Sequence, residues 1–589
     1  MSLPSTVPNV LGNTALDAPF DVVIVGSGAG GSAAAHVLAG AGMKVLILEA
    51  GNNYFPGLDN PDHLPFPLFS NDELKFGRRM VLQDPVVEPR TFRQSAAETA
   101  RAHPDVNVLA RNVGGTTVHA DMKYPRFNEI DFRLASALRD GGRTFDGTSF
   151  VDWPLTYDEL QPFYVTAENL SGVSGRADGE GADPFASPRS GPYPLPPTAE
   201  MYVARTLADG ARKKGYHPIH YPGAVNSRPY GGRPACNNCG FCSGFGCPNN
   251  SKGSAAVTTL RSALLTGNCQ VRFNCFARRL VRNGNSIAAV EYTDADGAIQ
   301  SVTADRFILA ASAVESARLC LLSDRDGPGL GNSSDQLGRH LMYHFQTTAV
   351  GIFKQRLHGE RGNSVSNGMA DFRGVTEGGM SLRSDVPLGG IIEFGTSSEP
   401  LRSNKAFLRP DALAFAHLVG LPLKQLLVEG PFTAHIAVLT MQAEDAPQPT
   451  NRVQLDPTVR DVYGLPVPMV TYQNHGFELD ARTFYQPKML QILGAAGAQF
   501  GFFQPYDPSE PPDSRHVMGG LRMGSDPHTS VCDPFGKFHD LDNLYNADGG
   551  VFVTSSGYNP TLTIIALALR TAGHIVAPGH AERVIASHI

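Results

Sequence analysis

The sequence lacks two features that would point to a membrane or to nucleic acid. No uninterrupted apolar run reaches the roughly 18 residues that a bilayer-spanning helix needs, so we expect no membrane segment. Positive charge is not in excess, because 49 Lys and Arg residues stand against 56 Asp and Glu residues, for a formal net charge of −7. Proteins that bind nucleic acid usually carry a basic surface. We therefore expect no nucleic-acid partner.

The N-terminal segment lacks the marks of export. Residues 1–19 contain neither a positively charged start followed by an apolar stretch nor a pair of arginines. Such a segment predicts a cytoplasmic protein, although export together with a secreted partner subunit would leave no trace in this chain. Cysteine is also scarce, with 8 residues among 589, so the sequence predicts no disulfide framework.

A strand, a glycine-rich turn and a helix near the N-terminus have the pattern of a dinucleotide site. Residues 21–25 form a short apolar run of the kind that parallel sheets bury on both faces. Gly26, Gly28 and Gly31 follow with the spacing G-x-G-x-x-G. The first glycine permits a tight turn, the second lets the backbone approach a diphosphate, and the third lets the helix pack close to the strand. The N-terminus of that helix then points its free N–H groups at the phosphate.

A second predicted strand, residues 45–48, ends in Glu49, about 20 residues after the glycines. A carboxylate in this place accepts hydrogen bonds from the ribose of an adenosine and favours a cofactor without a 2′-phosphate. We interpret the unit as a site for FAD rather than NAD, because it stands at the extreme N-terminus of a long single chain.

A second glycine-rich segment, residues 112–122, suits the flavin ring. Gly114 and Gly115 let the backbone approach a ligand closely, and the hydroxyl of Thr116 and the following N–H groups can hold an isoalloxazine ring. His119 stands four residues after the glycine pair. It is either a covalent attachment point for the flavin or, as we prefer, an uncharged histidine that packs or hydrogen-bonds.

Four of the cysteines are clustered. They follow the pattern C-x2-C-x2-C-x4-C with a proline directly after the last one, which is close to a ferredoxin-type run with one extra residue. Three interpretations remain open: thiolate ligands of an iron–sulfur cluster, ligands of zinc, and a glycine-rich loop with unmetallated thiols. The cysteines concerned are Cys236, Cys239, Cys242 and Cys247.

The C-terminal block holds the residues best suited to chemistry. His516 lies in HVMGG, Asp548 and Gly549 lie in NLYNADG, and Asn559, Pro560 and Thr561 lie in YNPTLTI. The last motif opens a predicted apolar helix through Leu569, with Pro560 at its first position, where proline is favoured. The N-terminus of this helix can face an electron-rich flavin edge.

Taken together and in this order, the motifs resemble those of the glucose-methanol-choline (GMC) flavoprotein oxidoreductases. The quoted motifs are the N-terminal glycine unit, GGTTVH, ILAASAVESARLCLL, HxxGG followed by RMG, and NLYNADGG with NPTLTI, and they span nearly the whole chain. The resemblance implies bound FAD and oxidation of an alcohol carbon by hydride transfer to flavin N5. It implies that His516 and Asn559 are the catalytic pair and that Asp548 lies near the flavin ribityl chain and diphosphate.

Within that family the cysteine segment and its surroundings look similar to the gluconate, glucose and fructose dehydrogenases, some of which bind a three-iron cluster, and we also note the bacterial pyranose and glycoside oxidases. The resemblance favours a sugar, glycoside, sugar acid or polyol as substrate, with oxygen or an external acceptor, and a small or cytochrome subunit as a partner. The alternatives are a long-chain, aromatic or sterol alcohol as substrate, and a flavin-binding electron-transfer subunit without turnover.

The expected fold is mixed α/β, α+β overall, with a Rossmann-like FAD-binding domain interleaved with an antiparallel-sheet substrate-binding domain. A hairpin is predicted at residues 294–297 between strands 288–292 and 299–303, followed by a separate buried strand at 307–311 and a helix at 314–322. The predicted segments are 18–172 (FAD-binding, with a lid-like excursion at about 52–105), 173–227 (linker and first substrate part), 228–340 (FAD-binding, including 236–247), 341–500 (substrate-binding) and 501–589 (FAD-binding, with the catalytic motifs).

Overall fold

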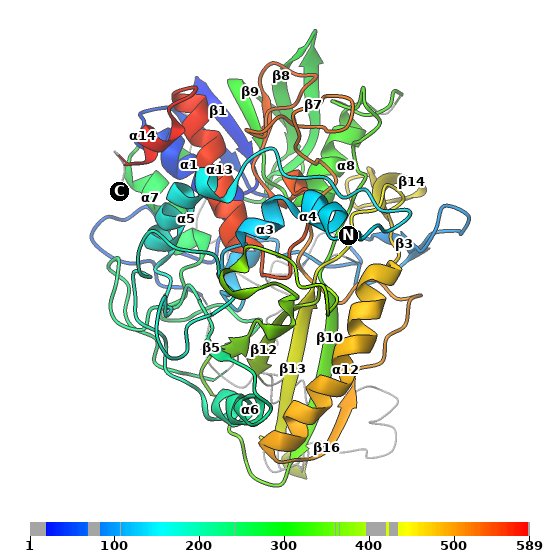
Figure 1. Cartoon of the computed structure of the whole chain (residues 1–589). Coiled ribbons are helices and arrows are strands. Elements are labelled where there is room, and N and C mark those ends of the chain that lie inside the picture. The colour runs from blue at the N-terminus through cyan, green and yellow to red at the C-terminus, as the bar shows by residue number, and fades with distance from the viewer. Residues whose placement is uncertain are drawn as a thin grey trace.

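The structure is a computed structural model of the chain, and it describes residues 19–68, 83–106, 108–240, 242–324, 326–359, 361–363, 366–395, 420–422 and 434–586. Figure 1 shows two main parts: a sheet with α1 and α13 beside it in the upper half, and a second sheet with α6 and α12 in the lower half. Three sheets are present in the described residues.

The first sheet contains the predicted dinucleotide unit. Its parallel centre runs in the order β6-β2-β1-β9, and β17 pairs with β9 in parallel. The hairpin strands β8 and β7 extend it in antiparallel fashion. The strands are β1 (Phe20–Val25), β2 (Val45–Leu48), β6 (Cys269–Arg272), β7 (Phe276–Asn283), β8 (Ser286–Thr293), β9 (Ile299–Leu309) and β17 (Leu544–Asn546).

One expectation for this region is wrong. The segments 299–303 and 307–311, which we expected to form two strands, belong to the single strand β9, which ends at Leu309. Its first half pairs with β8, and its second half pairs with β1 and β17. The two halves of one long strand therefore pair with different neighbouring strands. Local sequence patterns do not reveal such a change of pairing partner. The hairpin turn itself is confirmed.

Helices cover this sheet, and one of them, α13, follows Pro560 of the YNPTLTI motif. Helix α1 contacts α7 and α13, and α13 also contacts α5 and α14. Hydrogen-bonded helix α13 begins at Thr561, so Pro560 is its N-cap and not its first residue, although its φ of −84° and ψ of −11° are already helical. The helices are α1 (Ala29–Gly40), α3 (Glu129–Phe132), α4 (Leu134–Asp140), α5 (Tyr157–Ser171), α7 (Thr259–Leu265), α8 (Ala313–Ser323), α13 (Thr561–Val576) and α14 (Ala581–Ala586).

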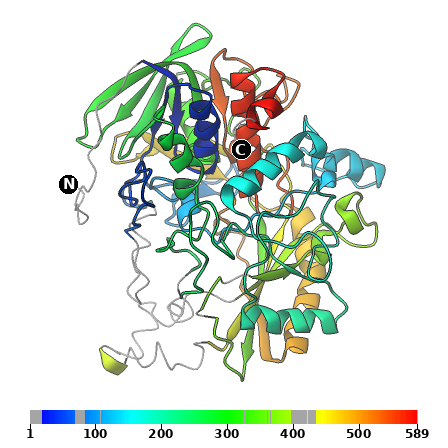
Figure 2. The same ribbon diagram turned by 90° about the vertical axis from the view of Figure 1, so that its left-hand side faces the viewer.

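The second sheet is antiparallel throughout, in the order β16-β10-β13-β12-β11-β5. Alternate residues of its strands pack with α6 (Tyr202–Lys213) and α12 (Gly476–Ala496) into a separate apolar core. Both views place these two helices side by side on one end of the molecule (Figures 1 and 2). The strands are β5 (Pro218–His220), β10 (Phe345–Phe353), β11 (Asn367–Met369), β12 (Gly390–Gly395), β13 (Ile436–Ala443) and β16 (Ala498–Phe503).

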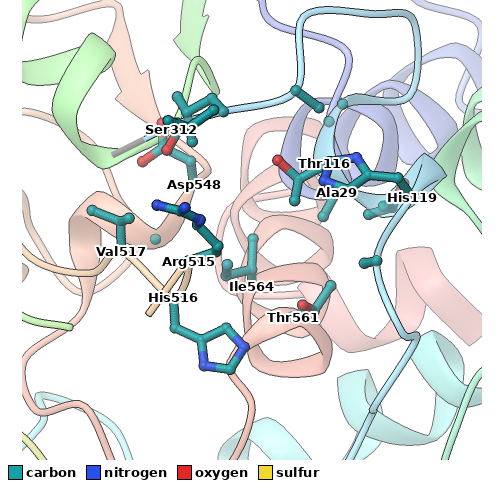
Figure 3. Close-up of a pocket in the computed structure, with 18 of the residues that line it drawn as sticks. Ala29, Thr116, His119, Ser312, Arg515, His516, Val517, Asp548, Thr561 and Ile564 are labelled. Carbon is teal, nitrogen blue, oxygen red and sulfur yellow. The ribbon is translucent and has the colours of Figure 1, made fainter. Parts of the chain in front are cut away.

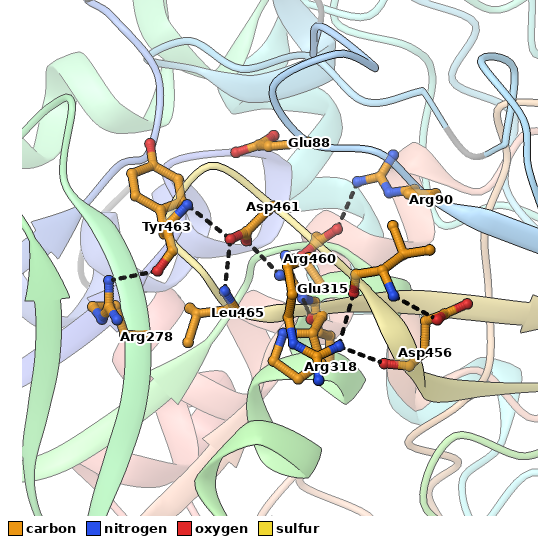
Figure 4. A network of polar contacts seen from close by, with 12 residues as sticks. Glu88, Arg90, Arg278, Glu315, Arg318, Asp456, Arg460, Asp461, Tyr463 and Leu465 are labelled. Carbon is orange, nitrogen blue, oxygen red and sulfur yellow. Dashed lines mark hydrogen bonds and ion pairs between the residues drawn. The ribbon is translucent and has the colours of Figure 1, made fainter. Parts of the chain in front are cut away.

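A third, four-stranded sheet takes in part of the expected lid-like excursion. Its order is β14-β15-β3-β4, with β14 (Arg452–Arg460), β15 (Pro466–Thr471), β3 (Thr91–Arg93) and β4 (Arg101–Ala102). Figure 4 shows the charged network that ties this sheet to helix α8. Arg318 pairs with Asp461 at 2.6 Å and with Glu315 at 3.2 Å, and Arg90 pairs with Glu315 at 2.6 Å. Among the described helices, none combines the length and the apolar character needed to cross a membrane.

Candidate active site

A cavity of about 820 Å³ lies between the first and second sheets and reaches from the glycine turn to the predicted catalytic residues. Figure 3 shows Ala29, Thr116 and His119 on one side of it and Arg515, His516 and Val517 on the other. Most of the residues that the sequence singled out line this cavity. They are Gly26, Gly28, Glu49, Gly115, Thr116, His119, His516, Asp548, Gly549, Asn559, Pro560 and Thr561.

Gly31 and Gly114, two predicted cofactor residues, do not line the cavity. A Cβ atom on Gly31 would clash with the carbonyl oxygen of Gly26, so this glycine lets α1 pack onto the turn, as its place in the motif predicts. The N–H of Gly114 donates to the Ser27 hydroxyl at 3.0 Å. Both residues therefore shape the cavity wall from behind.

Gly28 stands at the position where the motif predicts a diphosphate. A Cβ atom built on it meets no protein atom within 4 Å, because it would project into the open cavity. The chain thus leaves space at the start of helix α1, where backbone N–H groups are directed at a bound anion. These residues fit the diphosphate of a dinucleotide.

The Glu49 carboxylate is already bonded within the protein. Its Oε2 accepts from the Ser27 N–H at 3.0 Å and from the Ser27 hydroxyl at 2.7 Å, and its Oε1 accepts from the Gly51 N–H at 2.8 Å. Burial raises the pKa of Glu49. Carboxylate oxygens accept more than one hydrogen bond. The protein donors therefore fix the group and leave it able to bind a ribose hydroxyl as well.

His516 and Asn559 meet at the other end of the cavity. The Nδ2 of Asn559 lies 3.4 Å from Nε2 of His516, and the Asn559 amide also donates to Glu393 at 3.1 Å. The hydroxyl of Tyr221 donates to Oδ1 of Asn559. Two residues 43 positions apart are thus brought together at one wall, as the family motif implies.

The surroundings of His516 determine its protonation. Burial lowers its pKa to about 3, and the Lys123 ammonium acts in the same direction. Desolvation disfavours the charged imidazolium, and a sequence motif carries no information about it. His516 is therefore neutral at physiological pH, with a lone pair available for a proton.

Asp548 lies between strand β17 and helix α13. It caps the short 3-10 helix Gly549–Val551 by accepting from the Gly550 N–H at 2.8 Å, and it accepts from the Ser316 hydroxyl at 2.5 Å. Burial raises its pKa. A fixed acceptor in this place suits a polyhydroxylated chain such as the ribityl part of a flavin.

Several cavity residues were not predicted from the sequence. Lys123 pairs with Glu393 at 2.5 Å and with Asp121 at 3.3 Å, directly beside His516. His344 contacts His516 from behind, with 2.8 Å between the two Nδ1 atoms. One signal was available: Glu393 is the only charged residue of the apolar strand β12, and a lone charge in an apolar strand needs a buried partner.

The face of the second sheet that is turned to the cavity is polar. Gln346 and Thr348 of β10 line the cavity, and Gln442 and Thr440 of β13 stand opposite them in register. Phe345 and Ala349, on the other face of β10, belong to the apolar core with α6 and α12, and Thr347 lies between Gln346 and Thr348. Gln346 donates to Gln442 at 3.0 Å, and the hydroxyls of Thr348 and Thr440 lie 3.3 Å apart. Glu393 stands opposite Thr440 on the next strand. Donors and acceptors thus cover the cavity side of three strands.

Comparison with known proteins gives the family. Two models of GMC oxidoreductase match residues 198–346 and 447–568, and a model of an NAD(P)-binding Rossmann-like domain matches residues 24–58. The fructose dehydrogenase large subunit of Gluconobacter japonicus is 30% identical and aligns over 94% of this chain and 97% of its own length. The chain belongs to the GMC oxidoreductase family.

Other relatives are similar over the same length. The gluconate 2-dehydrogenase flavoprotein of Pantoea cypripedii is 28% identical over 94% of this chain and 92% of its own, and the paromamine 6'-oxidase of Streptomyces fradiae is 29% identical over 94% and 91%. Among solved structures, pyridoxine 4-oxidase from Mesorbium loti shares the fold with a TM-score of 0.60 at 17% identity, covering 94% of this chain and 98% of its own.

The GMC assignment makes the protein an FAD-dependent oxidoreductase that acts on CH–OH donors, and it confirms the expected mixed fold with a Rossmann-like unit. The residues present fit FAD. The space at Gly28 suits the diphosphate, Glu49 suits the ribose, and the same cavity continues to His516, the residue that the family resemblance implies as catalytic. Thr116 and Thr561 lie along the cavity wall between those ends.

The four clustered cysteines line a separate cavity of about 20 Å³. That volume is close to what a single water needs, so it does not fit an iron–sulfur cluster without movement of the loop. Burial raises the pKa of Cys242 to about 12, so this side chain is a thiol while no metal ion is bound to it. Among the described residues, no three His, Cys, Asp or Glu side chains are arranged to hold one metal ion.

Proposed function

We propose that this GMC oxidoreductase oxidises a secondary or primary alcohol group of a polyhydroxylated molecule, such as a sugar, glycoside, sugar acid or polyol. The observation that carries the proposal is the polar sheet face formed by Gln346, Thr348, Glu393, Thr440 and Gln442. Hydroxyl and amide groups on β10 and β13 and the Glu393 carboxylate on β12 supply both donors and acceptors, as a ring of hydroxyls requires. These groups already bond to one another or to Lys123 and Asn559, and a sterol or long-chain alcohol would leave their remaining hydrogen-bonding capacity unused in a site closed to water, which costs free energy.

The names of several relatives support this proposal. Proteins described as fructose dehydrogenase, gluconate 2-dehydrogenase and paromamine 6'-oxidase each act on a polar, multiply hydroxylated compound. A relative described as 2-methyl-1,2-propanediol dehydrogenase, 28% identical over 94% of this chain, acts on a small diol. The polar face distinguishes this group of substrates from the hydrophobic alternative.

The chain's own residues supply the proton chemistry. An alcohol releases hydride readily only as its oxygen becomes an alkoxide, so a base must remove the hydroxyl proton. In the proposed reaction His516 Nε2 takes that proton and Asn559 Nδ2 donates a hydrogen bond to the same oxygen. FAD, when bound, supplies the acceptor for the hydrogen that leaves carbon with two electrons. The carbon–oxygen bond becomes a carbonyl, and the charges balance.

The test is an anaerobic screen in which substrate bleaches the flavin absorbance. We expect sugars, sugar acids or polyols to bleach it and long-chain, aromatic and sterol alcohols not to. Bleaching by hydrophobic alcohols alone would overturn the substrate class.

In His516→Ala the reduction rate should fall by about 10²–10⁴-fold with FAD content unchanged, and in Asn559→Ala by less. His528→Ala, an exposed histidine, is the matched control and should reduce at the wild-type rate.

A partner subunit and an iron–sulfur cluster form a second part of the proposal. The relative described as a large subunit supports a partner that carries electrons away from the flavin. The gathering of Cys236, Cys239, Cys242 and Cys247 around one cavity supports a cluster, although the loop would have to open to admit it. Iron and acid-labile sulfide in amounts stoichiometric with the protein, measured after anaerobic preparation, would confirm the cluster. Values near zero for iron and zinc would leave structural thiols.

A further inference from the structure

Two polar contacts link the main chain to His516 through a second histidine. The His344 Nε2 lies 3.1 Å from the carbonyl oxygen of Ser555, and its Nδ1 lies 2.8 Å from Nδ1 of His516. The two rings stand nearly perpendicular, at 83°, with centroids 4.8 Å apart. His516 Nε2 then faces Asn559 and the cavity. His344 itself is almost fully buried, immediately before strand β10.

The direction of each hydrogen bond in this chain follows from its first member. A carbonyl oxygen only accepts, so His344 must carry its proton on Nε2. Burial lowers the pKa of His344 to about 3, with the His516 ring acting in the same direction, so the ring is neutral and its Nδ1 only accepts. The proton between the rings must therefore sit on Nδ1 of His516. That leaves Nε2 of His516 as a lone pair directed at the cavity.

We propose that His344 is a positioning residue that fixes the tautomer of His516 and so keeps the reactive Nε2 free of a proton. In the other tautomer Nε2 would carry the proton and His516 would be unable to take one from an alcohol. The proposal rests on the proposed function, in which His516 is the base. It adds a residue that contacts His516 but does not line the cavity.

The amide of Asn559 agrees with this assignment independently. Its nitrogen faces the Glu393 carboxylate, which accepts at 3.1 Å, and its oxygen accepts from Tyr221. The pairing of Glu393 with Lys123 holds that carboxylate in place. The nitrogen that remains near His516 is therefore a donor, and it matches an Nε2 without a proton. Two chains of contacts from opposite directions give the same tautomer.

The Ser555 carbonyl is held firmly in its own turn. Ser556 has a φ of 57°, which non-glycine residues rarely adopt. Its N–H donates to Glu444 at 2.8 Å and its hydroxyl donates to Asp131 at 2.8 Å, while the Ser555 hydroxyl accepts from the Asp445 N–H at 2.8 Å. The strained turn is thus fixed by buried carboxylates, which gives the carbonyl a defined direction toward His344.

The charged groups near the two rings do not supply an alternative proton donor in the chain. Lys123 and Asp121 act on His516 from the cavity side, and His516, Arg373 and Glu393 act on His344. None of these lies between the rings, where the contact is direct. The hydrogen bonds therefore run in one direction only, with His516 donating to His344 and His344 donating to the Ser555 carbonyl.

The first test replaces His344 in the FAD-loaded enzyme. Leu fills the space without an acceptor, whereas the Asn side chain places an oxygen near the position of Nδ1. We expect His344→Leu to slow anaerobic flavin reduction by about 10²–10⁴-fold with substrate affinity and FAD content unchanged. His344→Asn should recover most of that loss. His435→Leu is the matched control, because His435 also contacts a carbonyl, that of Phe353, yet does not line the cavity.

Equal rates in the Leu and Asn variants, whether both fast or both slow, would overturn the proposal. If His344→Leu does not fold, the wild-type protein provides the second test. In ¹⁵N-histidine-labelled wild type, the resonances missing from His516→Ala identify His516, and we expect the shifts of an Nδ1-protonated neutral ring. An Nε2-protonated ring would refute the assignment. Failure of the base role itself shows separately, as an unchanged rate in His516→Ala.

Discussion

The proposed base, His516, is a histidine that its surroundings keep neutral. Enzymes often tune a base toward the working pH, but burial lowers the pKa of His516 to about 3 and leaves it neutral over the whole physiological range. A weak base accepts the hydroxyl proton only while the hydride is leaving, so the two transfers must be closely coupled. Lys123, beside the same ring, disfavours any protonation before substrate arrives.

This low pKa predicts the pH dependence of flavin reduction. Between pH 5 and 8 the rate, measured anaerobically by stopped flow, should show no acid limb from a histidine near its ordinary pKa of about 6.5. Stability behaves differently. The unfolded chain binds more protons than the folded chain between about pH 3 and 6.5, so His516 makes stability fall as the pH falls through that range. An acid limb in the rate near pH 6.5 that disappears in His516→Gln would contradict the prediction.

At the scale of elements, the proposed function assigns substrate selection to the antiparallel sheet. Its strands have one face for α6 and α12 and one face for the cavity, and the period of two along β10 and β13 separates the two roles. Apolar residues at alternate positions build a core, so the polar residues between them are free to contact a ligand. Changes on the cavity face should therefore alter binding with little effect on folding.

We predict that Gln442→Leu and Thr440→Val each raise the KM for the best sugar or polyol. Loss of one hydrogen bond costs about 0.5–1.5 kcal/mol, which corresponds to a change of roughly 2- to 10-fold. Steady-state kinetics on the purified variants measure it, and kcat should change less than KM. Gln499→Leu makes the same chemical change on strand β16, outside the cavity, and should leave KM unaltered. An unchanged KM in both cavity variants would exclude this face from substrate binding.

Elements also show where sequence reasoning stops. Gly28, Glu49, His516 and Asn559 stand in short motifs, whose spacing is set by local turns and helix starts, and the structure brings all four to one cavity. His344 has no such local signature, and the only signal for Glu393 is a lone charge within the apolar strand β12. They reach the site because strands β10 and β12 lie in one sheet, and strand pairing over long distances along the chain leaves no mark in a short window.

The same limit explains the two errors in the fold. The segments taken as separate strands at 299–303 and 307–311 are continuous because β9 exchanges one neighbour for another along its length. The start of helix α13 differs by one residue from the expectation, because Pro560 has helical φ and ψ but lies at the N-cap and not at the first helical position. The proposed division into five segments stays a prediction, although strands from 218–220 to 498–503 do share one sheet.

At the scale of the whole molecule, the cofactor cavity joins distant parts of the chain. Its wall includes residues near the N-terminus, such as Gly28, and residues near the C-terminus, such as Ile564, on different layers of the fold. A ligand that binds only the folded state stabilises it by mass action. FAD should therefore stabilise the entire enzyme and not one domain alone.

We predict that removing FAD lowers the melting temperature and that adding it back restores the holoenzyme value. At a free FAD concentration 100 times the Kd, the gain is about 2.7 kcal/mol. Gly28→Val should hold no FAD, melt like the wild-type apoprotein and show no shift when FAD is added, because the side chain fills the diphosphate space. Gly494→Val also adds a side chain in open space, but on α12, and should bind FAD normally. Full flavin occupancy in Gly28→Val would overturn the cofactor assignment.

The pairing of β9 with both β1 and β17 means that the first sheet can be completed only late in protein synthesis. The strand at 20–25 leaves the ribosome more than 500 residues before the strand at 544–546, and Gly30 of the cofactor turn packs against Ala547. At about 5–20 residues per second, roughly 25–100 s separate the two. Throughout that interval the nascent chain has its glycine turn but not the wall behind it. Loading with FAD is therefore a step that follows synthesis, and a truncated chain that ends before residue 544 has no finished place for the cofactor.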